Sequence, residues 1–148
     1  MNEEQNKKMG IGFGIMILKN HKVLLGKRHD DPVKASSALH GEGTWTMPGG
    51  KLHYGEKPQD GAKREVKEET SIETGSLKLI SMTNDIVPDA HFVTFGFLCE
   101  DFRGEPKVME PDEITEWRWF DLDNLPSPMY RSSQKIINNY HHQTFYSD

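Results

Sequence analysis

The chain has 148 residues, of which 34% are hydrophobic and 28% charged, and its formal net charge is -5. This size and balance are typical of one soluble globular domain. No apolar run is long enough to span a bilayer, and the acidic charge argues against a nucleic acid polymer, which requires a basic face. The polar start lacks the apolar segment of a signal peptide. We therefore expect a flexible N-terminus over residues 1–8, a single domain over residues 9–148 and a cytoplasmic location.

Cys99 is the only cysteine of the chain. A single thiol excludes intrachain disulfides and cysteine-based zinc clusters, so we expect it to be a small buried residue.

The first third of the chain predicts short strands and one long loop. Residues 11–18 and 22–25 are apolar runs separated by a polar turn, which predicts a hairpin. Residues 29–43 show no periodicity and predict a long loop, either a lid over a binding site or a mobile insertion. A brief strand at 44–47 then leads into Pro48 to Gly50, where paired glycines permit close approach of a ligand.

The remainder predicts two helices and three further strands. Pro58 suits the first turn of a helix and good helix formers follow it, so we expect a helix at 58–70. We expect strands at 77–84, 91–99 and 115–120, and a closing helix at 128–141. Because this order does not repeat as βαβ units, it favours an α+β fold with a mixed sheet and helices packed on its faces.

Glu65, Glu68 and Glu69 share one face of the expected helix, because they lie at positions i, i+3 and i+4. Like charges at this spacing repel by roughly 0.2–0.5 kcal/mol per pair, and Arg64 is placed to offset only Glu68, at i+4. The apolar residues beside Glu69 put these carboxylates at the margin of the buried stripe. Taken alone, such a pattern is usually a solvated acidic face; the alternative is a divalent cation that relieves the repulsion.

The surrounding run, GKLHYGEKPQDGAKREVKEETSI from Gly50 to Ile72, resembles the signature of the Nudix hydrolase family. Six of its seven invariant positions match, and Ser71 departs, standing where the family usually has Gly. Glycine at a helix end supplies a left-handed turn, so Ser71 costs about 1 kcal/mol and removes no catalytic group. The flanking runs VLLGKR, TWTMPGG, EPDE and EWRWFDLDNLP resemble the branch that cleans nucleoside triphosphates. The resemblance implies a Nudix-type α/β/α sandwich with a mixed central sheet.

The resemblance also implies a Mg²⁺ site, with Mn²⁺ as a substitute. Glu65 and Glu69 would bind the metal, and Glu68 would share or support that role. Arg64 would orient a carboxylate, while Glu56 would be either an orienter or a further ligand. The implied ligands, including the backbone carbonyl of Gly49 or Gly50, are Gly49, Gly50, Glu56, Glu65, Glu68, Glu69 and Glu113.

The general base is either Glu65 or Glu113. These two residues, together with Glu68 and Arg64, form the predicted catalytic set. We favour Glu113 as an additional metal ligand; the alternative is a turn residue in a solvated acidic cluster with Glu110 and Asp112. The expected substrate contacts are Arg28, Lys51, Thr46 and Tyr130, with Arg28 and Lys51 directed at phosphates. Four aromatic residues could stack on a base: Phe13, Phe92, Trp117 and Tyr130. Aromatic residues in strands are, however, more often part of the core. The histidines lack the spacing of a transition-metal site.

The expected function is Mg²⁺-dependent cleavage of deoxynucleoside or nucleoside triphosphates, oxidised or modified ones included, to monophosphate and pyrophosphate. An alternative within the family is a pyrophosphatase of nucleotide sugars or ADP-ribose. An alternative of another class is a catalytically silent nucleotide-binding module, against which the intact glutamates argue. We expect a small nucleotide as partner, no nucleic acid polymer, no membrane, and a monomer or homodimer.

Overall fold

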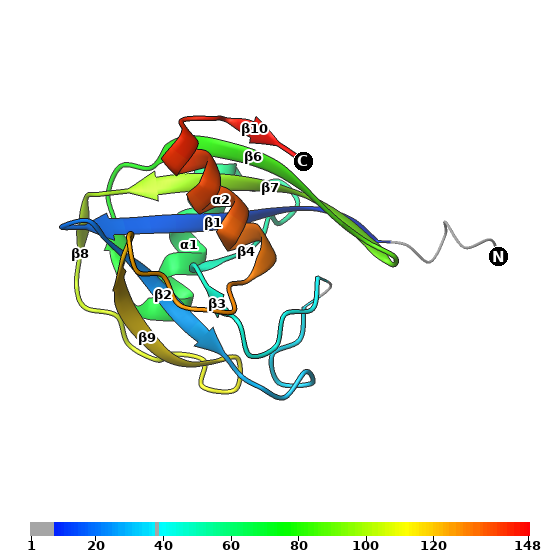
Figure 1. Ribbon diagram of the computed structural model, residues 1–148, viewed down its shortest axis with the longest axis horizontal. Coiled ribbons are helices and arrows are strands. Elements are labelled where there is room, and N and C mark those ends of the chain that lie inside the picture. The colour runs from blue at the N-terminus through cyan, green and yellow to red at the C-terminus, as the bar shows by residue number, and fades with distance from the viewer. Residues whose placement is uncertain (1–7, 38) are drawn as a thin grey trace.

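A computed structural model describes residues 8–37 and 39–148 (Figure 1). Its central strand, β1 (Lys8–Lys19), pairs antiparallel with β2 (Lys22–Arg28). Between them Asn20 and His21 adopt φ angles of 52° and 64°, which is the left-handed geometry of a tight hairpin turn. The predicted hairpin is confirmed. Residues 1–7 of the expected flexible start lie outside the described residues, and Lys8 already belongs to β1.

The half of the sheet on one side of β1 contains both parallel and antiparallel strand pairs. β1 runs parallel to β7 (Ala90–Cys99), which pairs antiparallel with β6 (Lys78–Val87). β10 (Tyr146–Ser147) adds a parallel edge to β6. The strands predicted at 77–84 and 91–99 are confirmed, and both parallel and antiparallel neighbours make this the mixed sheet that the sequence predicted.

The other half of the sheet is antiparallel. β2 pairs with β9 (Ile114–Asp121) and with the short strand β3 (Trp45–Thr46). β4 (Gly49–Lys51) returns alongside β1. The sequence did not predict β4, which holds only three residues and no period-two pattern. A Cβ atom at Gly49 would collide with the Phe13 carbonyl oxygen, so glycine is what lets β4 approach β1 closely.

Two helices cover opposite faces of this sheet (Figure 1). Successive side chains of a strand point to opposite faces, so Ile15 packs in the cluster under α1 (Pro58–Thr70), whereas Met16 packs in the cluster under α2 (Arg131–His142). The result is the expected α/β/α sandwich. Cys99 is fully buried in the cluster under α1.

α1 has the predicted bounds. Pro58 stands in its first turn, and the N-cap Lys57 makes no side-chain capping bond. The helix ends where Ser71 adopts a φ of 69° and donates its N–H to the Lys67 carbonyl at 2.9 Å. Ser71 therefore takes the left-handed conformation that glycine would adopt with less strain.

Some boundaries differ from the sequence prediction. α2 begins at Arg131 and not at residue 128, because Tyr130 is extended, with a ψ of 136°. Two short strands, β5 (Glu73–Thr74) and β8 (Phe102–Arg103), form a separate two-stranded sheet. Strands of two residues carry no periodicity that a sequence pattern could reveal.

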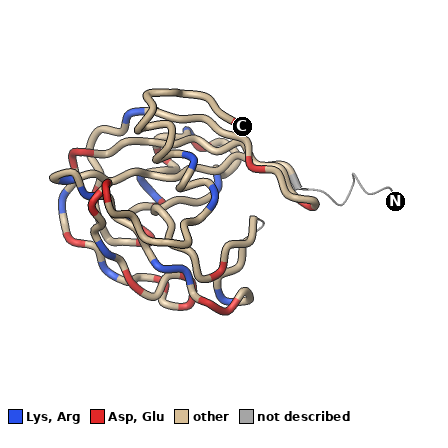
Figure 2. Tube along the Cα trace, in the orientation of Figure 1, with Lys and Arg blue, Asp and Glu red and all other residues tan. Residues whose placement is uncertain are grey.

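No helix in the described ranges is long and apolar enough to cross a membrane. Lys and Arg residues are interspersed with Asp and Glu along the trace (Figure 2).

Candidate active site

A cleft of about 460 Å³ opens between α1, β4, the loop at residues 29–43 and the start of α2. Its volume suits a ligand of nucleotide size. The glutamates of α1 lie on one wall, and the loop contributes Ser36, Ser37 and Leu39. Most of the predicted site residues line it: Arg28, Thr46, Gly49, Gly50, Lys51, Glu65, Glu68, Glu69, Glu113 and Tyr130. The loop thus forms part of the cleft wall, as the lid interpretation expects.

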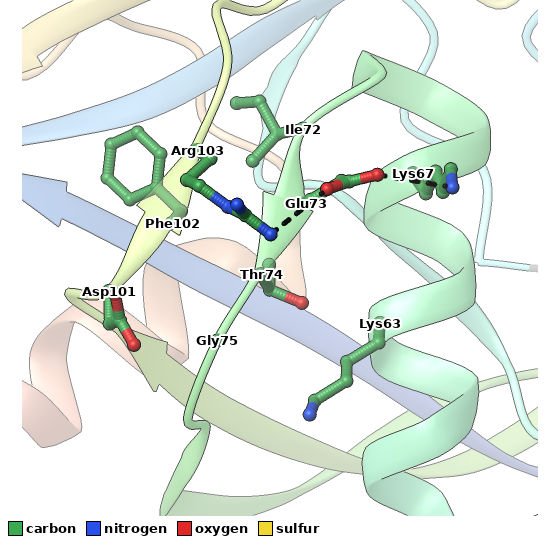
Figure 3. Close-up of a pocket in the computed structure, with 9 residues that line it drawn as sticks. All are labelled: Lys63, Lys67, Ile72, Glu73, Thr74, Gly75, Asp101, Phe102 and Arg103. Atoms are coloured by element: carbon green, nitrogen blue, oxygen red, sulfur yellow. Dashed lines mark hydrogen bonds and ion pairs between the residues drawn. The ribbon is translucent and has the colours of Figure 1, made fainter.

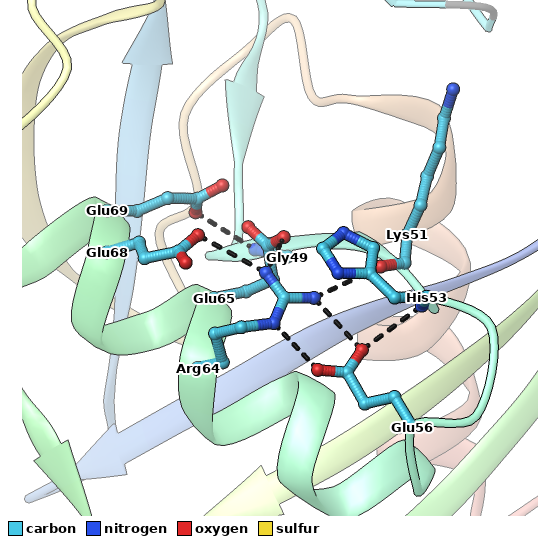
Figure 4. A network of polar contacts seen from close by, with 8 residues as sticks. All are labelled: Gly49, Lys51, His53, Glu56, Arg64, Glu65, Glu68 and Glu69. Atoms are coloured by element: carbon cyan, nitrogen blue, oxygen red, sulfur yellow. Dashed lines mark hydrogen bonds and ion pairs between the residues drawn. The ribbon is translucent and has the colours of Figure 1, made fainter.

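Arg64 holds three carboxylates at once (Figure 4). Its Nε and Nη2 donate to the two oxygens of Glu56, at 2.7 and 3.0 Å. Its Nη1 donates to Glu65 at 2.8 Å and to Glu68 at 3.2 Å. The expectation that Arg64 offsets only Glu68 was wrong, because the guanidinium fork also reaches the neighbouring Glu65 and a residue outside the helix.

Glu56 is fixed from two sides. Besides Arg64, the backbone N–H of His53 donates to its Oε1 at 3.1 Å. Hydrogen bonds from Arg64 and His53 lower the pKa of the Glu56 carboxyl to about 2. Glu56 does not line the cleft, so it supports Arg64 from behind the carboxylate face of α1.

Glu69 has a different environment from Glu56. Its Oε2 accepts the backbone N–H of Gly49 at 3.1 Å, and no ion pair to it is found in the part of the chain that the structure describes. Burial raises its pKa well above the usual range, and the nearby Glu65 charge adds to this effect. When Glu69 is ionised, no cation among the described residues forms an ion pair with it.

The environment of Glu65 combines features of the other two: it is partly buried, like Glu69, and it is bound by Arg64, like Glu56. Its carboxyl packs so closely against β4 that a Cβ atom at Gly50 would collide with it. Burial raises the pKa of Glu65, while the hydrogen bond from Arg64 opposes the shift. Glycine at position 50 therefore leaves room for the Glu65 carboxyl beside the strand.

Two further glutamates face α1 across the cleft. Glu110 and Glu113 belong to the turn before β9, where the N–H of Glu113 donates to the Glu110 carbonyl at 2.9 Å. Partial burial raises the pKa of Glu110, and the charges of Glu113, Glu65 and Glu68 raise it further. The sequence alone left open whether the acidic cluster of Glu110, Asp112 and Glu113 is merely solvated, and Glu110 and Glu113 line the cleft. Asp112 does not line the cleft.

Arg28 anchors the loop that borders the cleft. Its Nε donates to the Gly41 carbonyl at 2.9 Å and its Nη2 to the Ala35 carbonyl at 2.5 Å. The guanidinium also lies 5.0 Å from the ring centroid of Tyr130, whose hydroxyl is 2.9 Å from Ser37 Oγ. Arg28 and Tyr130 thus connect β2 and the start of α2 to the loop.

The other predicted substrate contacts lie deeper or at the rim. Lys51 extends over the Phe92 ring, 5.3 Å from its centroid. Thr46 is buried, with its hydroxyl 3.2 Å from Ser133 Oγ. Of the four aromatic candidates, Phe13, Phe92 and Tyr130 line the cleft, whereas Trp117 packs against the core under α1.

A separate group of potential metal ligands lies outside the cleft. His21, Asp121 and Asp123 place ligand atoms within 4.8 Å of one another, and all three are exposed. His21 Nε2 is 3.2 Å from Asp123 Oδ2. This proximity of a histidine to two carboxylates was not visible in the sequence, because residues 21 and 121 meet only through the pairing of β2 with β9.

The model of the NUDIX domain matches residues 8–140. The chain belongs to the Nudix family. It is therefore a Nudix hydrolase acting on phosphoanhydride bonds, and Nudix enzymes generally use a divalent metal ion and act on small nucleotide substrates. The resemblance found in the run from Gly50 to Ile72 is confirmed.

Relatives of this Nudix chain carry several activities in their names. An ADP-ribose pyrophosphatase of Methanocaldococcus jannaschii is 33% identical over 127 residues, 84% of this chain and 69% of that protein. The 8-oxo-dGTP diphosphatase of Escherichia coli K12 is 29% identical, over 81% of this chain and 89% of that protein. An NAD-capped RNA hydrolase NudC of Pseudomonas putida is 32% identical, but the match spans only 41% of its length.

The fold agrees with a solved relative. The crystal structure of a MutT NUDIX hydrolase from Burkholderia pseudomallei superposes with a TM-score of 0.79 at 30% identity, covering 89% of this chain and 98% of that one.

Proposed function

We propose that this Nudix hydrolase cleaves nucleoside triphosphates to the monophosphate and pyrophosphate. The observation that carries the proposal is the convergence of five glutamates on one cleft. Glu65, Glu68 and Glu69 come from α1, and Glu110 and Glu113 come from the opposite turn. Basic and polar residues that can bind phosphate line the same cleft.

The donor set fits a divalent cation. Carboxylate and carbonyl oxygens are the ligands that Mg²⁺ prefers, and the raised pKa values of Glu65, Glu69 and Glu110 show that burial and mutual repulsion are not fully offset by described cations. We propose Glu65, Glu69 and Glu113 as ligands, with Glu68 and the Gly49 or Gly50 carbonyl in support. A bound divalent ion screens phosphate charge and makes water more acidic.

The chain's own residues would carry out the remaining steps. Arg64 orients Glu65 and Glu68, and Glu56 holds Arg64 in place. The ion pair between Glu56 and Arg64 supports a role for Glu56 in orienting Arg64, and not a role as a metal ligand. Glu65 or Glu113 would accept the proton of the attacking water, because both line the cleft.

Binding of the nucleotide would use the rest of the cleft. Lys51, Thr46 and Tyr130 all line the cleft. This supports a phosphate contact for Lys51 and nucleoside contacts for Thr46 and Tyr130. Arg28 already donates to two loop carbonyls, so in this conformation its contribution is to shape the loop, and its charge supports phosphate binding through the long-range field.

Two observations support the preference for triphosphates: the flanking sequence, and the large share of two relatives' length that this chain matches. The matches to the Escherichia coli 8-oxo-dGTP diphosphatase and the Burkholderia pseudomallei MutT structure span 89% and 98% of those chains. The second candidate is an ADP-ribose pyrophosphatase, favoured by 33% identity to the Methanocaldococcus jannaschii protein.

A substrate panel tests the proposal. Nucleoside triphosphates, ADP-ribose and nucleotide sugars are incubated with Mg²⁺, and phosphate is measured with malachite green after pyrophosphatase treatment, or after phosphatase treatment for the diphosphate substrates. We expect triphosphates to be hydrolysed fastest, with activity abolished by EDTA and restored by Mg²⁺ or Mn²⁺. Full activity in excess EDTA would contradict the metal assignment, and no turnover of any substrate would favour a silent binding module.

A further inference from the structure

A second cavity of about 510 Å³ lies between α1 and the small sheet of β5 and β8. It shares no lining residue with the active-site cleft. On the helical wheel, Lys63 and Lys67 flank the buried stripe of α1 on one edge, while Glu65 and Glu69 flank it on the other. The two cavities therefore lie along different edges of the same helix.

Positive charge exceeds negative charge around this cavity. Three basic side chains, Lys63, Lys67 and Arg103, line it together with two carboxylates, Glu73 and Asp101. This local excess contrasts with the net charge of -5 for the whole chain. The cavity thus favours an anion over a cation.

The one carboxylate that pairs with these cations does so at long distance. Glu73 is 3.5 Å from the Lys67 ammonium and 3.6 Å from Arg103 Nη2 (Figure 3). Close charge-assisted hydrogen bonds measure about 2.7–2.9 Å. Lys63 forms no ion pair within the described ranges of the chain. Glu73 is 54% exposed, so its side chain is free to turn outward and leave the cations to another anion.

A buried hydroxyl provides an independent sign of a ligand. Thr74 Oγ1 is buried and has no hydrogen-bond partner within residues 8–37 and 39–148. Buried polar groups are nearly always satisfied, so one that is not calls for a partner. Thr74 lines the same cavity as Lys63, and Figure 3 shows both side chains directed toward the space between β5 and α1.

We propose that this cavity binds a phosphate dianion through Lys63, Arg103 and Thr74. A tetrahedral oxyanion has several acceptor oxygens, so one such ion can accept hydrogen bonds from more than one donor, and guanidinium groups bind phosphate in two-point geometry. Phosphate displaces the Glu73 carboxylate from Arg103 when it binds. The site is separate from the active site and stands whether or not the proposed reaction is correct.

The test is an NMR titration of the full chain, labelled with ¹⁵N, with inorganic phosphate in EDTA at constant ionic strength. The amide signals of Thr74, Gly75 and Arg103 shift saturably, whereas those of Gly49 and Gly50 in the active-site cleft stay in place. Lys63→Gln and Arg103→Gln each raise the dissociation constant for phosphate by about tenfold, because each substitution removes a charge-assisted contact. Lys22→Gln, the same change at an exposed site on β2, leaves it unchanged.

Three results would overturn the proposal. The first is the absence of saturable shifts at Thr74 and Gly75. The second is binding of equal strength in wild type, Lys63→Gln and Arg103→Gln. The third is a response centred on Gly49 and Gly50, which would place the phosphate in the active-site cleft. Because the replaced side chains are at the surface, the dispersion of each variant's spectrum verifies its fold in the same experiment.

Discussion

Arg64 and Glu56 form a two-point ion pair, with Nε to Oε2 at 2.7 Å and Nη2 to Oε1 at 3.0 Å. The remaining nitrogen, Nη1, is thereby aimed at Glu65 and Glu68. A planar guanidinium is able to serve all three carboxylates because its donors are fixed in one fork, which a lysine ammonium lacks.

Arg64→Lys should therefore lower kcat while leaving KM nearly unchanged. We expect a loss of roughly 10–100-fold, the usual effect of removing a group that orients metal ligands. Steady-state kinetics with a nucleoside triphosphate measures it. Arg118→Lys, at an exposed arginine paired with Glu116, is the matched control. Equal kcat in wild type and Arg64→Lys would show that the fork does not position the carboxylates.

Glu69→Gln should lower kcat by at least about 100-fold, because it removes a proposed metal ligand. The melting temperature without metal should stay level or rise, since the substitution replaces a carboxyl whose ionised form is disfavoured by burial and by the Glu65 charge. Calorimetry in EDTA measures this, with Glu100→Gln as an exposed control. A large fall in the melting temperature would instead assign α1's glutamates a structural role.

The Glu56 carboxyl predicts a pH dependence of stability. Its pKa is about 2 in the folded chain against 4.5 for an unperturbed glutamate. A lowered pKa stabilises the folded state above about pH 4.5, and this stabilisation is lost as pH falls toward 2. Glu56→Gln should therefore be less stable than wild type in urea unfolding at about pH 7, and the difference should shrink at about pH 3. A constant difference at both pH values would contradict the ion pair as its source.

Much of the active site was predictable because its spacing is local. The helix at 58–70 follows from Pro58 and its helix formers, and the convergence of Glu65, Glu68 and Glu69 follows from the period of the helix. The left-handed Ser71 follows from its place at the helix end. Each of these features depends on neighbours within a few residues along the chain.

The features that sequence reasoning missed depend on contacts between distant segments. Glu110 faces α1 only because the turn before β9 folds over the cleft. Arg28 binds two loop carbonyls, and the sequence could not reveal these contacts because tertiary structure places the loop; its expected contact with phosphate stays a prediction. β4 exists because glycine at position 49 permits close pairing with β1, and a pattern of hydrophobic residues contains no such information.

The loop contact of Tyr130 predicts an effect on substrate binding. Tyr130→Phe removes the hydroxyl that lies 2.9 Å from Ser37 Oγ. One neutral hydrogen bond contributes about 0.5–1.5 kcal/mol, so KM should rise by about 2–10-fold with little change in kcat. Limited proteolysis should cut the loop at residues 29–43 faster. Tyr54→Phe, at a fully exposed tyrosine, is the control, and an unchanged KM and cleavage rate for Tyr130→Phe would contradict the role of the contact.

Identification of the reaction products tests the central claim most directly. A deoxynucleoside triphosphate is hydrolysed with Mg²⁺ and the products are separated by anion exchange, alongside kcat/KM for the triphosphate and for ADP-ribose. We predict the monophosphate and pyrophosphate, and a preference for the triphosphate of at least about tenfold, which corresponds to about 1.4 kcal/mol of transition-state binding. The diphosphate with orthophosphate, or a tenfold preference for ADP-ribose, would contradict the proposed reaction.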